Sequence, residues 1–160
     1  MIITHITEFI ENIPRTGRLI AFDVGQKKIG VAMSDVLRII ASPHEIYERF
    51  NIKKDVNKAH SYIKHNEVNG IIIGLPLGLS GEEGELGETI RTFASKLNKE
   101  CAVPIYLQDE RFTTKQAHKI MSDYSLSWKK KVLVEDKIAA SFILQATLDQ
   151  MNYYFSSEDN

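Results

Sequence analysis

The chain has 160 residues, of which 43% are apolar and 26% are charged, and its formal net charge is −1 at pH 7. These values are ordinary for a globular protein, and a chain of this length can bury a substantial core in one domain. The small net charge excludes a strongly basic nucleic-acid coat but allows a local basic face. We therefore predict a single domain over residues 1–160.

The cysteine count and the lengths of the apolar runs indicate the cellular compartment. Cys101 is the only cysteine, so an intrachain disulfide and a metal site of paired thiolates are both excluded. No apolar run reaches the roughly 18 residues of a membrane span, and the first residues lack the basic region of a signal peptide. We expect a cytoplasmic protein with no membrane partner.

The first residues, 1–17, are predicted to be a helical extension of the domain. Their apolar side chains recur at helical spacing, which is typical of an amphipathic helix packed on a core, and Pro14 is expected to end it. The apolar positions are Ile2, Ile6, Phe9, Ile10 and Ile13. At the other end of the chain, residues 156–160 are predicted to be a polar tail.

The segment RLIAFDVGQKKIGVAMSD, residues 18–35, predicts a hairpin with an acid at the end of a strand. The apolar run at residues 19–22 is typical of a strand buried on both faces. Asp23 ends this run, Gly25 leaves the backbone beside the acid uncrowded, and a second strand is predicted over residues 29–33. A carboxylate on a rigid strand beside bare backbone suits a metal or phosphate site.

Beyond the hairpin, the sequence predicts a third strand and then helices that alternate with strands. Pro43 interrupts the third strand, which indicates a sheet edge or a bulge. The run GIIIG is typical of a short buried strand, and a glycine-rich acidic loop follows it at residues 77–86. The predicted strands cover residues 38–46, 70–74 and a segment that starts at 104–107 and ends within 108–111. The predicted helices cover residues 53–67, 86–99, 113–124 and 135–154.

This order of elements predicts an α/β fold. Three antiparallel strands followed by parallel strands form a mixed sheet, and the intervening helices cover both of its faces. Ligands of such sheets collect beyond the carboxyl ends of the parallel strands. Asp23, the GLP turn at residues 74–76 and the pair Asp109-Glu110 all follow or end predicted strands, so we expect them to converge.

Acids at these strand ends favour metal-dependent phosphodiester hydrolysis. Asp23 and Glu110 end strands, and Asp136 begins the last predicted helix. Two hard cations about 3.5–4 Å apart can activate water and stabilise the leaving oxygen, and Mg²⁺ or Mn²⁺ takes oxygen ligands. Each acid alone also has a simpler structural use, such as an ion pair of Glu110 with Arg111 or a favourable helix-dipole interaction of Asp136.

Four ordered segments resemble the motifs of the YqgF/RuvX family. They are FDVGQKKIGVAMSD, IIIGLPLGLSGEEGE, DERFTTKQA and EDKIAASFILQATLD, and the resemblance extends from Arg18 to about Asp149. It implies a ribonuclease H-like fold related to RuvC-type resolvases, and a nuclease that processes the 5′ end of pre-16S rRNA. The family's acids fall on Asp23, Glu110 and Asp136, with Asp109 beside the second. Gly78 and Ser80 depart from the family's pattern in the loop.

Basic and glycine residues near the acids are candidates for holding the nucleic acid. Lys and Arg side chains bind phosphate oxygens, glycines allow backbone N–H groups to approach a phosphate backbone, and Trp128 could stack on a base. Solvated surface charge and a flexible connector are the simpler alternatives. The candidates are Lys27, Lys28, Arg111, Trp128, Lys129, Lys130 and Lys131, together with Gly74, Pro76 and Gly81 of the loop.

The leading hypothesis is a metal-dependent endonuclease that uses Mg²⁺ or Mn²⁺ and acts on structured nucleic acid. Its partner would be a ribosomal RNA precursor or branched DNA, and the protein would be a monomer or a weak homodimer. Two alternatives remain open. One is a non-cleaving, nucleic-acid-binding ribosome assembly factor, and the other is a Holliday junction resolvase acting on DNA. An actin-like ATPase is disfavoured because such proteins enclose the nucleotide between two domains of this kind.

Overall fold

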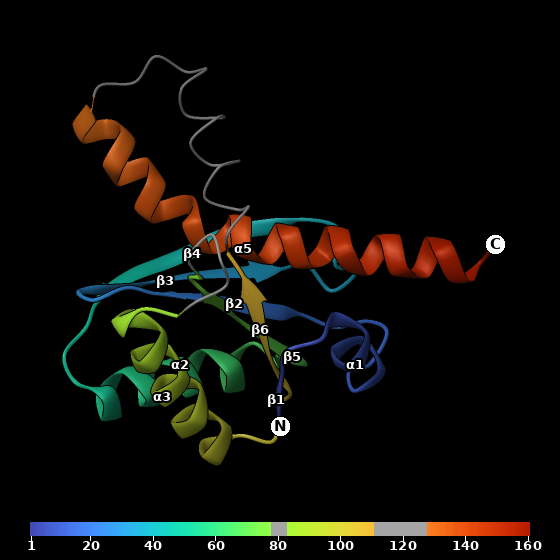
Figure 1. The fold of residues 1–160 in the computed structure, drawn as a ribbon, viewed down its shortest axis with the longest axis horizontal. Helices are drawn as coiled ribbons and strands as arrows, with labels where there is room; N and C mark the ends of the chain where they lie inside the picture. Colours follow the sequence, from blue (N-terminus) through green and yellow to red (C-terminus); the bar gives the residue numbers. More distant parts are fainter. Residues whose placement is uncertain (78–82, 111–127) are drawn as a thin grey trace.

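The computed structural model describes residues 1–77, 83–110 and 128–160, except for the side chains of residues 128–137. Its described strands form a six-stranded sheet in the order β1-β6-β5-β2-β3-β4 (Figure 1). The strands are β1 (Ile2–Ile3), β2 (Leu19–Val24), β3 (Lys28–Ser34), β4 (Ala41–Glu48), β5 (Gly70–Leu75) and β6 (Ile105–Asp109). The helices are α1 (Ile6–Glu11), α2 (Ile52–His65), α3 (Glu85–Glu100) and α5 (Trp128–Glu158).

The sheet is mixed, as the sequence predicts. Strands β2, β3 and β4 pair antiparallel, whereas β5 pairs parallel with both β2 and β6, and β1 adds to β6 in parallel. The strand β4 lies at the edge of the sheet. Its register with β3 shifts beside Pro43, which confirms the predicted bulge. Three parallel strands therefore end side by side, next to the β2–β3 turn.

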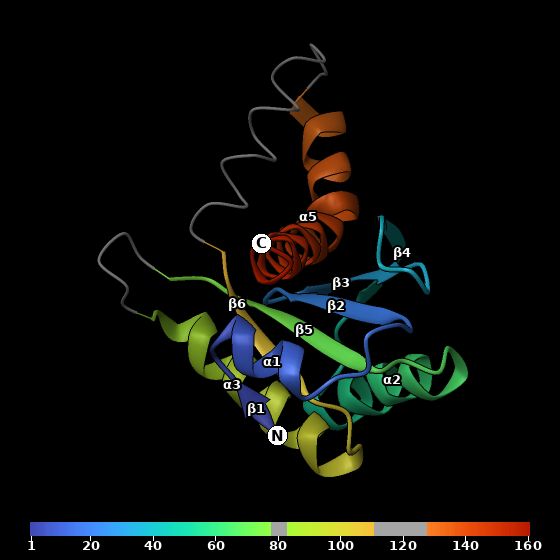
Figure 2. The same ribbon diagram turned by 90° about the vertical axis from the view of Figure 1, so that its right-hand side faces the viewer.

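Helices cover both faces of the sheet, which also confirms the prediction. Alternating residues of β2 show why. Ile20 and Phe22 pack with residues of α2 and α3, while Leu19 and Ala21 pack on the other face with residues of α1 and α5. Figure 2 shows α5 above the sheet and α2 and α3 below it. None of the helices in the described ranges is long and apolar enough to cross a membrane.

The N-terminal prediction is correct only in part. Residues Ile6–Glu11 form the short helix α1, but Ile2 and Ile3 extend as a strand that pairs with Ile105 and Tyr106 of β6. Ile3 is buried and Ile2 is exposed. The unpaired edge of β6 offers backbone hydrogen bonds to a β-branched segment, so tertiary pairing outweighs the helical spacing that includes Ile2.

Two other boundaries differ from the prediction. The third strand starts at Ala41 rather than at residue 38, because Arg38 has a φ of 58° and its guanidinium Nε donates to the Gly17 carbonyl at 2.7 Å. The last helix runs from Trp128 to Glu158 rather than over 135–154, so Asp136 lies well inside it rather than near its start, and the helix includes part of the predicted polar tail. Lysine-rich sequence sustains a helix well, which accounts for the earlier start. The predicted helix 113–124 lies outside the described residues.

Gly70 tests how tightly β5 packs. A Cβ at this position would lie 2.8 Å from both Leu19 Cδ2 and Phe9 Cζ, and both of those side chains are fully buried. We expect Gly70→Ala to lower the free energy of unfolding by about 1–3 kcal/mol through overpacking. Urea denaturation measures this. Gly84→Ala is the matched control, since a Cβ there meets nothing within 4 Å, and equal losses in both variants would contradict the packing argument.

Candidate active site

The carboxyl ends of β2, β5 and β6 place Asp23, Gly74 and Glu110 on the same face of the sheet. In β2, Asp23 follows Ala21 on the face that α5 covers. In β6, Thr147 Oγ1 of α5 donates to Gln108 Oε1 at 3.1 Å, so the next residue on that face is Glu110. The predicted convergence of strand ends is thus found for Asp23, Gly74 and Glu110, and it lies under α5.

Gly74 leaves the space that the Glu110 carboxyl group occupies. A Cβ on Gly74 would lie 2.3 Å from Glu110 Oε1, 2.6 Å from Glu110 Cδ and 2.6 Å from Ile143 Cδ1 of α5. The backbone N–H of Glu110 donates to the Leu75 carbonyl at 3.1 Å, which fixes the residue beside β5 just after β6 ends. Gly74 therefore lies within β5, as the predicted strand over 70–74 has it, and it has a steric role beside Glu110, while its approach to phosphate stays a prediction.

The electrostatics of Glu110 show how close the acids are. Burial, together with the negative charges of Asp23 and then of Asp109, raises the pKa of Glu110 to about 8. Neighbouring carboxylates repel one another unless a proton or a cation lies between them. The donor set consists of carboxylate oxygen atoms, and the lack of a side chain on Gly74 gives the Glu110 carboxyl group room beside β5. This arrangement fits a hard divalent cation.

Asp109 has a different position from Glu110. It is the last residue of β6 and pairs with Leu75, and strand alternation places it on the same side as Leu107, which packs with α3. Its charge still acts on Glu110 and on Tyr106. Asp109 is therefore close to the acids but projects from the opposite face of the strand.

Several predicted residues fall where side chains are not described. Asp136 lies within α5 rather than at its first turn, so a role at the helix start is wrong for it. Trp128, Lys129, Lys130 and Lys131 form the first turn of α5 rather than a loop. Arg111 and Gly81 lie outside the described residues. Among the described side chains, no group of three His, Cys, Asp or Glu residues is arranged to hold a metal ion.

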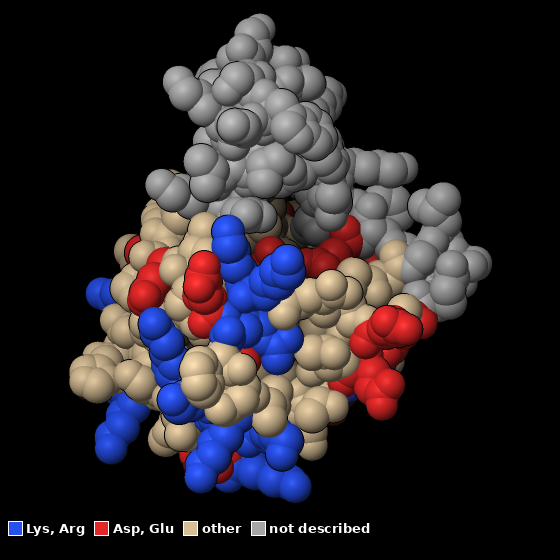
Figure 3. Space-filling view, turned by 90° about the vertical axis from the view of Figure 1, so that its left-hand side faces the viewer, with Lys and Arg blue, Asp and Glu red and all other residues tan. Residues whose placement is uncertain are grey.

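Lys27 and Lys28 share a surface cavity with Asp23. This cavity, of about 300 Å³, lies at the β2–β3 turn and is also lined by Gly25, Gln26 and Gly30. Figure 3 shows Lys and Arg side chains gathered on the end of the molecule that holds this turn, with acidic atoms visible at the border of the grey atoms. The two predicted lysines are thus beside the first acid. Pro76, by contrast, follows β5 directly and is only partly buried.

An ion pair that we did not expect from the sequence holds the β2–β3 turn. Arg49 Nε lies 2.9 Å from Oδ2 of the buried Asp55, and Arg49 Nη1 donates to the Gly25 carbonyl at 3.1 Å. The backbone N–H of Arg49 also donates to the Lys27 carbonyl at 2.8 Å. No local sequence pattern predicts these contacts, because they join the turn to Arg49 and Asp55, which follow more than 20 residues later in the chain.

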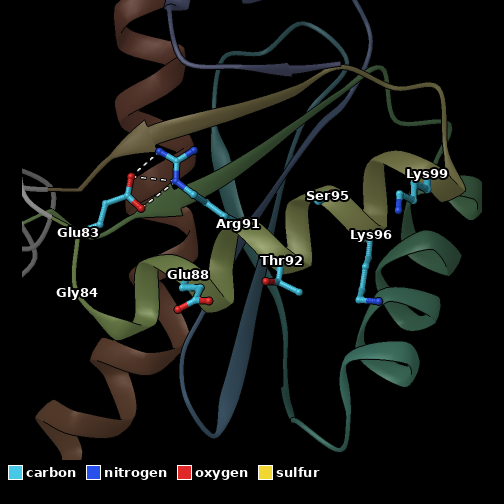
Figure 4. A pocket seen from close by; sticks show the side chains of 8 residues that line it. All are labelled: Glu83, Gly84, Glu88, Arg91, Thr92, Ser95, Lys96 and Lys99. Atoms are coloured by element: carbon cyan, nitrogen blue, oxygen red, sulfur yellow. Dashed lines mark hydrogen bonds and ion pairs between the residues drawn. The ribbon is translucent and has the colours of Figure 1, made fainter.

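A larger surface cavity lies elsewhere. It measures about 640 Å³ and lies along the exposed side of α3, where Glu83 pairs with Arg91 and where Thr92, Lys96 and Lys99 also point outward (Figure 4). Opposite charges alternate along it, and none of the predicted acids lines it. The smaller cavity at the β2–β3 turn is therefore the better candidate for a site, because it contains Asp23 and two lysines.

The raised pKa of Glu110 makes stability depend on pH in the metal-free protein. Between about pH 4.5 and pH 8 the folded state retains a proton that the unfolded chain releases, so stability falls as pH rises through this range. Glu110→Gln cannot ionise, so its stability relative to the wild type should increase between about pH 5 and about pH 8. Urea denaturation in EDTA measures this difference.

Added Mg²⁺ should restore stability to the wild type at the upper end of that range and should do less for Glu110→Gln, because the ion replaces the proton. Glu8→Gln on α1 serves as the control, since Glu8 is an exposed acid. A difference between Glu110→Gln and wild type that stays constant with pH would show that the pKa of Glu110 is not raised.

Gly74→Ala tests the space for the carboxyl group. The added methyl group displaces the Glu110 carboxylate, so we expect Mn²⁺ affinity, measured by calorimetry, to fall about tenfold or more. Because the methyl group also meets Ile143 Cδ1, the double variant Gly74→Ala/Ile143→Val relieves that contact alone. Recovery of full affinity in the double variant would show that helix packing, and not Glu110, causes the loss.

Comparison with known proteins agrees with the motifs. The family model RuvX, described as Holliday junction resolvase, matches residues 17–150. A Wolbachia pipientis wMel protein named "Putative pre-16S rRNA nuclease" is 42% identical over 145 residues, which cover 91% of this chain and 94% of the relative. A protein of the same name from Ehrlichia ruminantium (strain Welgevonden) is 39% identical over 154 residues, covering 96% and 99% of the two chains.

The fold is also found among solved structures. Fowlpox virus resolvase in complex with its Holliday junction DNA substrate superimposes with a TM-score of 0.51 at 14% identity, covering 84% of this chain and 98% of that chain. This likeness confirms the ribonuclease H-like fold, and the family match confirms the predicted class of activity, a nuclease. Since both the family model and relatives of about 40% identity align with nearly the whole sequence, the chain belongs to the RuvX family.

Proposed function

We propose that this protein hydrolyses phosphodiester bonds in a ribosomal RNA precursor, at the 5′ end of pre-16S rRNA, with divalent cations bound at the strand ends. One observation carries the proposal. Asp23 lies close enough to the partly buried Glu110 that its charge disfavours the ionised form of Glu110, on the face of the sheet that α5 covers. Such an arrangement costs stability, and it is useful where cations bind. The name of the relatives supports the substrate.

Asp23, Glu110 and Asp136 would hold Mg²⁺ or Mn²⁺. The first two converge at the ends of β2 and β6, and Asp136 belongs to α5, the helix that covers this face. Bound divalent ions supply an activated water and stabilise the departing oxygen. Asp109 projects from the other face of β6, and its main role in this proposal is to raise the pKa of Glu110 through its charge. Direct metal binding by Asp109 stays a prediction.

The basic residues would position the substrate. Lys27 and Lys28 line the cavity that contains Asp23, where their ammonium groups can bind the oxygens of the phosphate to be cleaved. We assign Arg111 the same task beside Glu110. Trp128 would stack on a base, and the phosphate contacts would come from Lys129, Lys130 and Lys131. We further propose that the protein acts in the cytoplasm as a monomer or a weak homodimer.

A Holliday junction is the second candidate substrate, since the family model carries that description. RNA and DNA are told apart mainly by contacts to the 2′-hydroxyl group. A fixed set of carboxylates serves either backbone, because the metals act on the phosphate that RNA and DNA share. The assay below therefore includes both substrates.

Asp23→Asn is the decisive variant. It removes one charge from the metal site, and we expect Mg²⁺-dependent cleavage of a labelled pre-16S fragment to fall at least about a hundredfold, since bound metals contribute several kcal/mol to the transition state. Gel analysis of the fragment and of a four-way DNA junction measures this. Glu8→Gln should cleave at the wild-type rate.

Each outcome decides between the hypotheses. Full cleavage by folded Asp23→Asn would remove the mechanism. Cleavage of the junction alone would favour the resolvase, and tight binding of the precursor without any cleavage by the wild type would favour the assembly factor.

A further inference from the structure

Phe50 is a large apolar side chain that the core does not use. It lies between β4 and α2 and is 74% exposed. Its backbone is nevertheless fixed, because its N–H donates to Asp55 Oδ1 at 3.2 Å and the next residue, Asn51, caps α2 by accepting from Lys54 N at 2.9 Å. An exposed aromatic ring on a rigid backbone loses little entropy when it binds a ligand.

The backbone of Phe50 follows directly on a residue that contacts the candidate active site. Arg49, the residue before it, donates through its backbone to the Lys27 carbonyl and through its guanidinium to the Gly25 carbonyl. Both carbonyls belong to the turn that lines the cavity containing Asp23. The Arg49–Asp55 ion pair therefore ties Phe50 and the β2–β3 turn into one rigid unit.

The surroundings of the ring are basic. Lys54 Nζ lies 3.9 Å from the centroid of the Phe50 ring, and Lys27, Lys28 and Lys53 are exposed nearby in the turn and in the first turn of α2. Glu48, the exposed acid of this stretch, pairs in register with Lys28. Positive charge thus predominates around Phe50.

We propose that Phe50 is a stacking platform for an unpaired base of the nucleic acid, and that the lysines around it bind the flanking phosphates. The inference rests on the proposed function and adds a substrate class to it. Aromatic rings bind single strands by stacking on bases, while nearby cations bind the backbone. A protein partner is less favoured, because Phe50 is the only apolar residue between β4 and α2 and a lysine ammonium group lies over its ring.

The platform selects for a single-stranded or frayed segment next to the cleavage site. In a continuous duplex the bases stack on one another and their faces are closed to the protein, whereas an unpaired base offers a free face. Stacking is tolerant of sequence, so the platform would favour open structure rather than a particular base.

Binding can be measured without cleavage in the Asp23→Asn background. We expect Phe50→Ala to weaken the binding of a short labelled single-stranded RNA about tenfold in fluorescence anisotropy, to leave a blunt duplex unchanged, and to retain the fold, since little area is buried. Phe50→Trp should bind as tightly as Phe50. Tyr153→Ala is the matched control, because Tyr153 is 79% exposed on α5, and it should change nothing.

Single-stranded DNA of the same sequence is the second arm. Equal losses on RNA and DNA would support stacking on the base alone, and a loss on RNA only would support stacking with added contacts to the sugar. Unchanged single-strand affinity in Phe50→Ala, or an equal loss on the duplex, would overturn the platform. If the wild type cleaves nothing while single-strand binding still depends on Phe50, then the proposed hydrolysis is wrong and the platform stands.

Discussion

The candidate active site depends on the sheet, which holds two carboxyl groups near one another although their charges repel. Strand β2 carries Asp23 to its carboxyl end and β6 delivers Glu110 to the neighbouring end, with β5 between them. The absence of a side chain on Gly74 lets the Glu110 carboxyl group lie over β5. Burial and the charge of Asp23 then raise the pKa of Glu110 to about 8. The cost of holding these acids together is the observation that supports the proposed cation site.

The packing of the helices on the sheet fixes the strands that carry these acids. Alternating residues of β2 bury one face against α2 and α3 and the other against α5, so the strand cannot shift by one residue without exposing Phe22 or Ala21. Thr147 of α5 donates a hydrogen bond to Gln108, two residues before Glu110, and this contact fixes the position of the helix along β6 near the acids. The helix that carries Asp136 is thereby attached to the face on which the other acids lie.

A second rigid unit lies beside the acids. Arg49 and Asp55 hold the β2–β3 turn from the side of α2, at 2.9 Å from one another, with Asp55 almost fully buried. Breaking such a buried pair leaves an uncompensated charge, so the turn is strongly fixed. It presents Lys27 and Lys28 at the cavity of Asp23 and Phe50 next to them. The proposed nucleic-acid contacts would therefore extend from the acids toward α2, over a backbone that these hydrogen bonds hold in place.

Much of this was predictable from the order of residues alone. The apolar runs at 19–22 and 70–74 specify buried strands, and the four motifs specify the family, because strand burial and local motif spacing are properties of neighbouring residues. Other features depend on segments distant in the chain. Ile2 joins β6 as a strand, Arg49 reaches Gly25 and Asp55, and Gly74 makes room for Glu110. Each of these results from a contact between elements that only the packed sheet brings together, so no local pattern in the sequence encodes it.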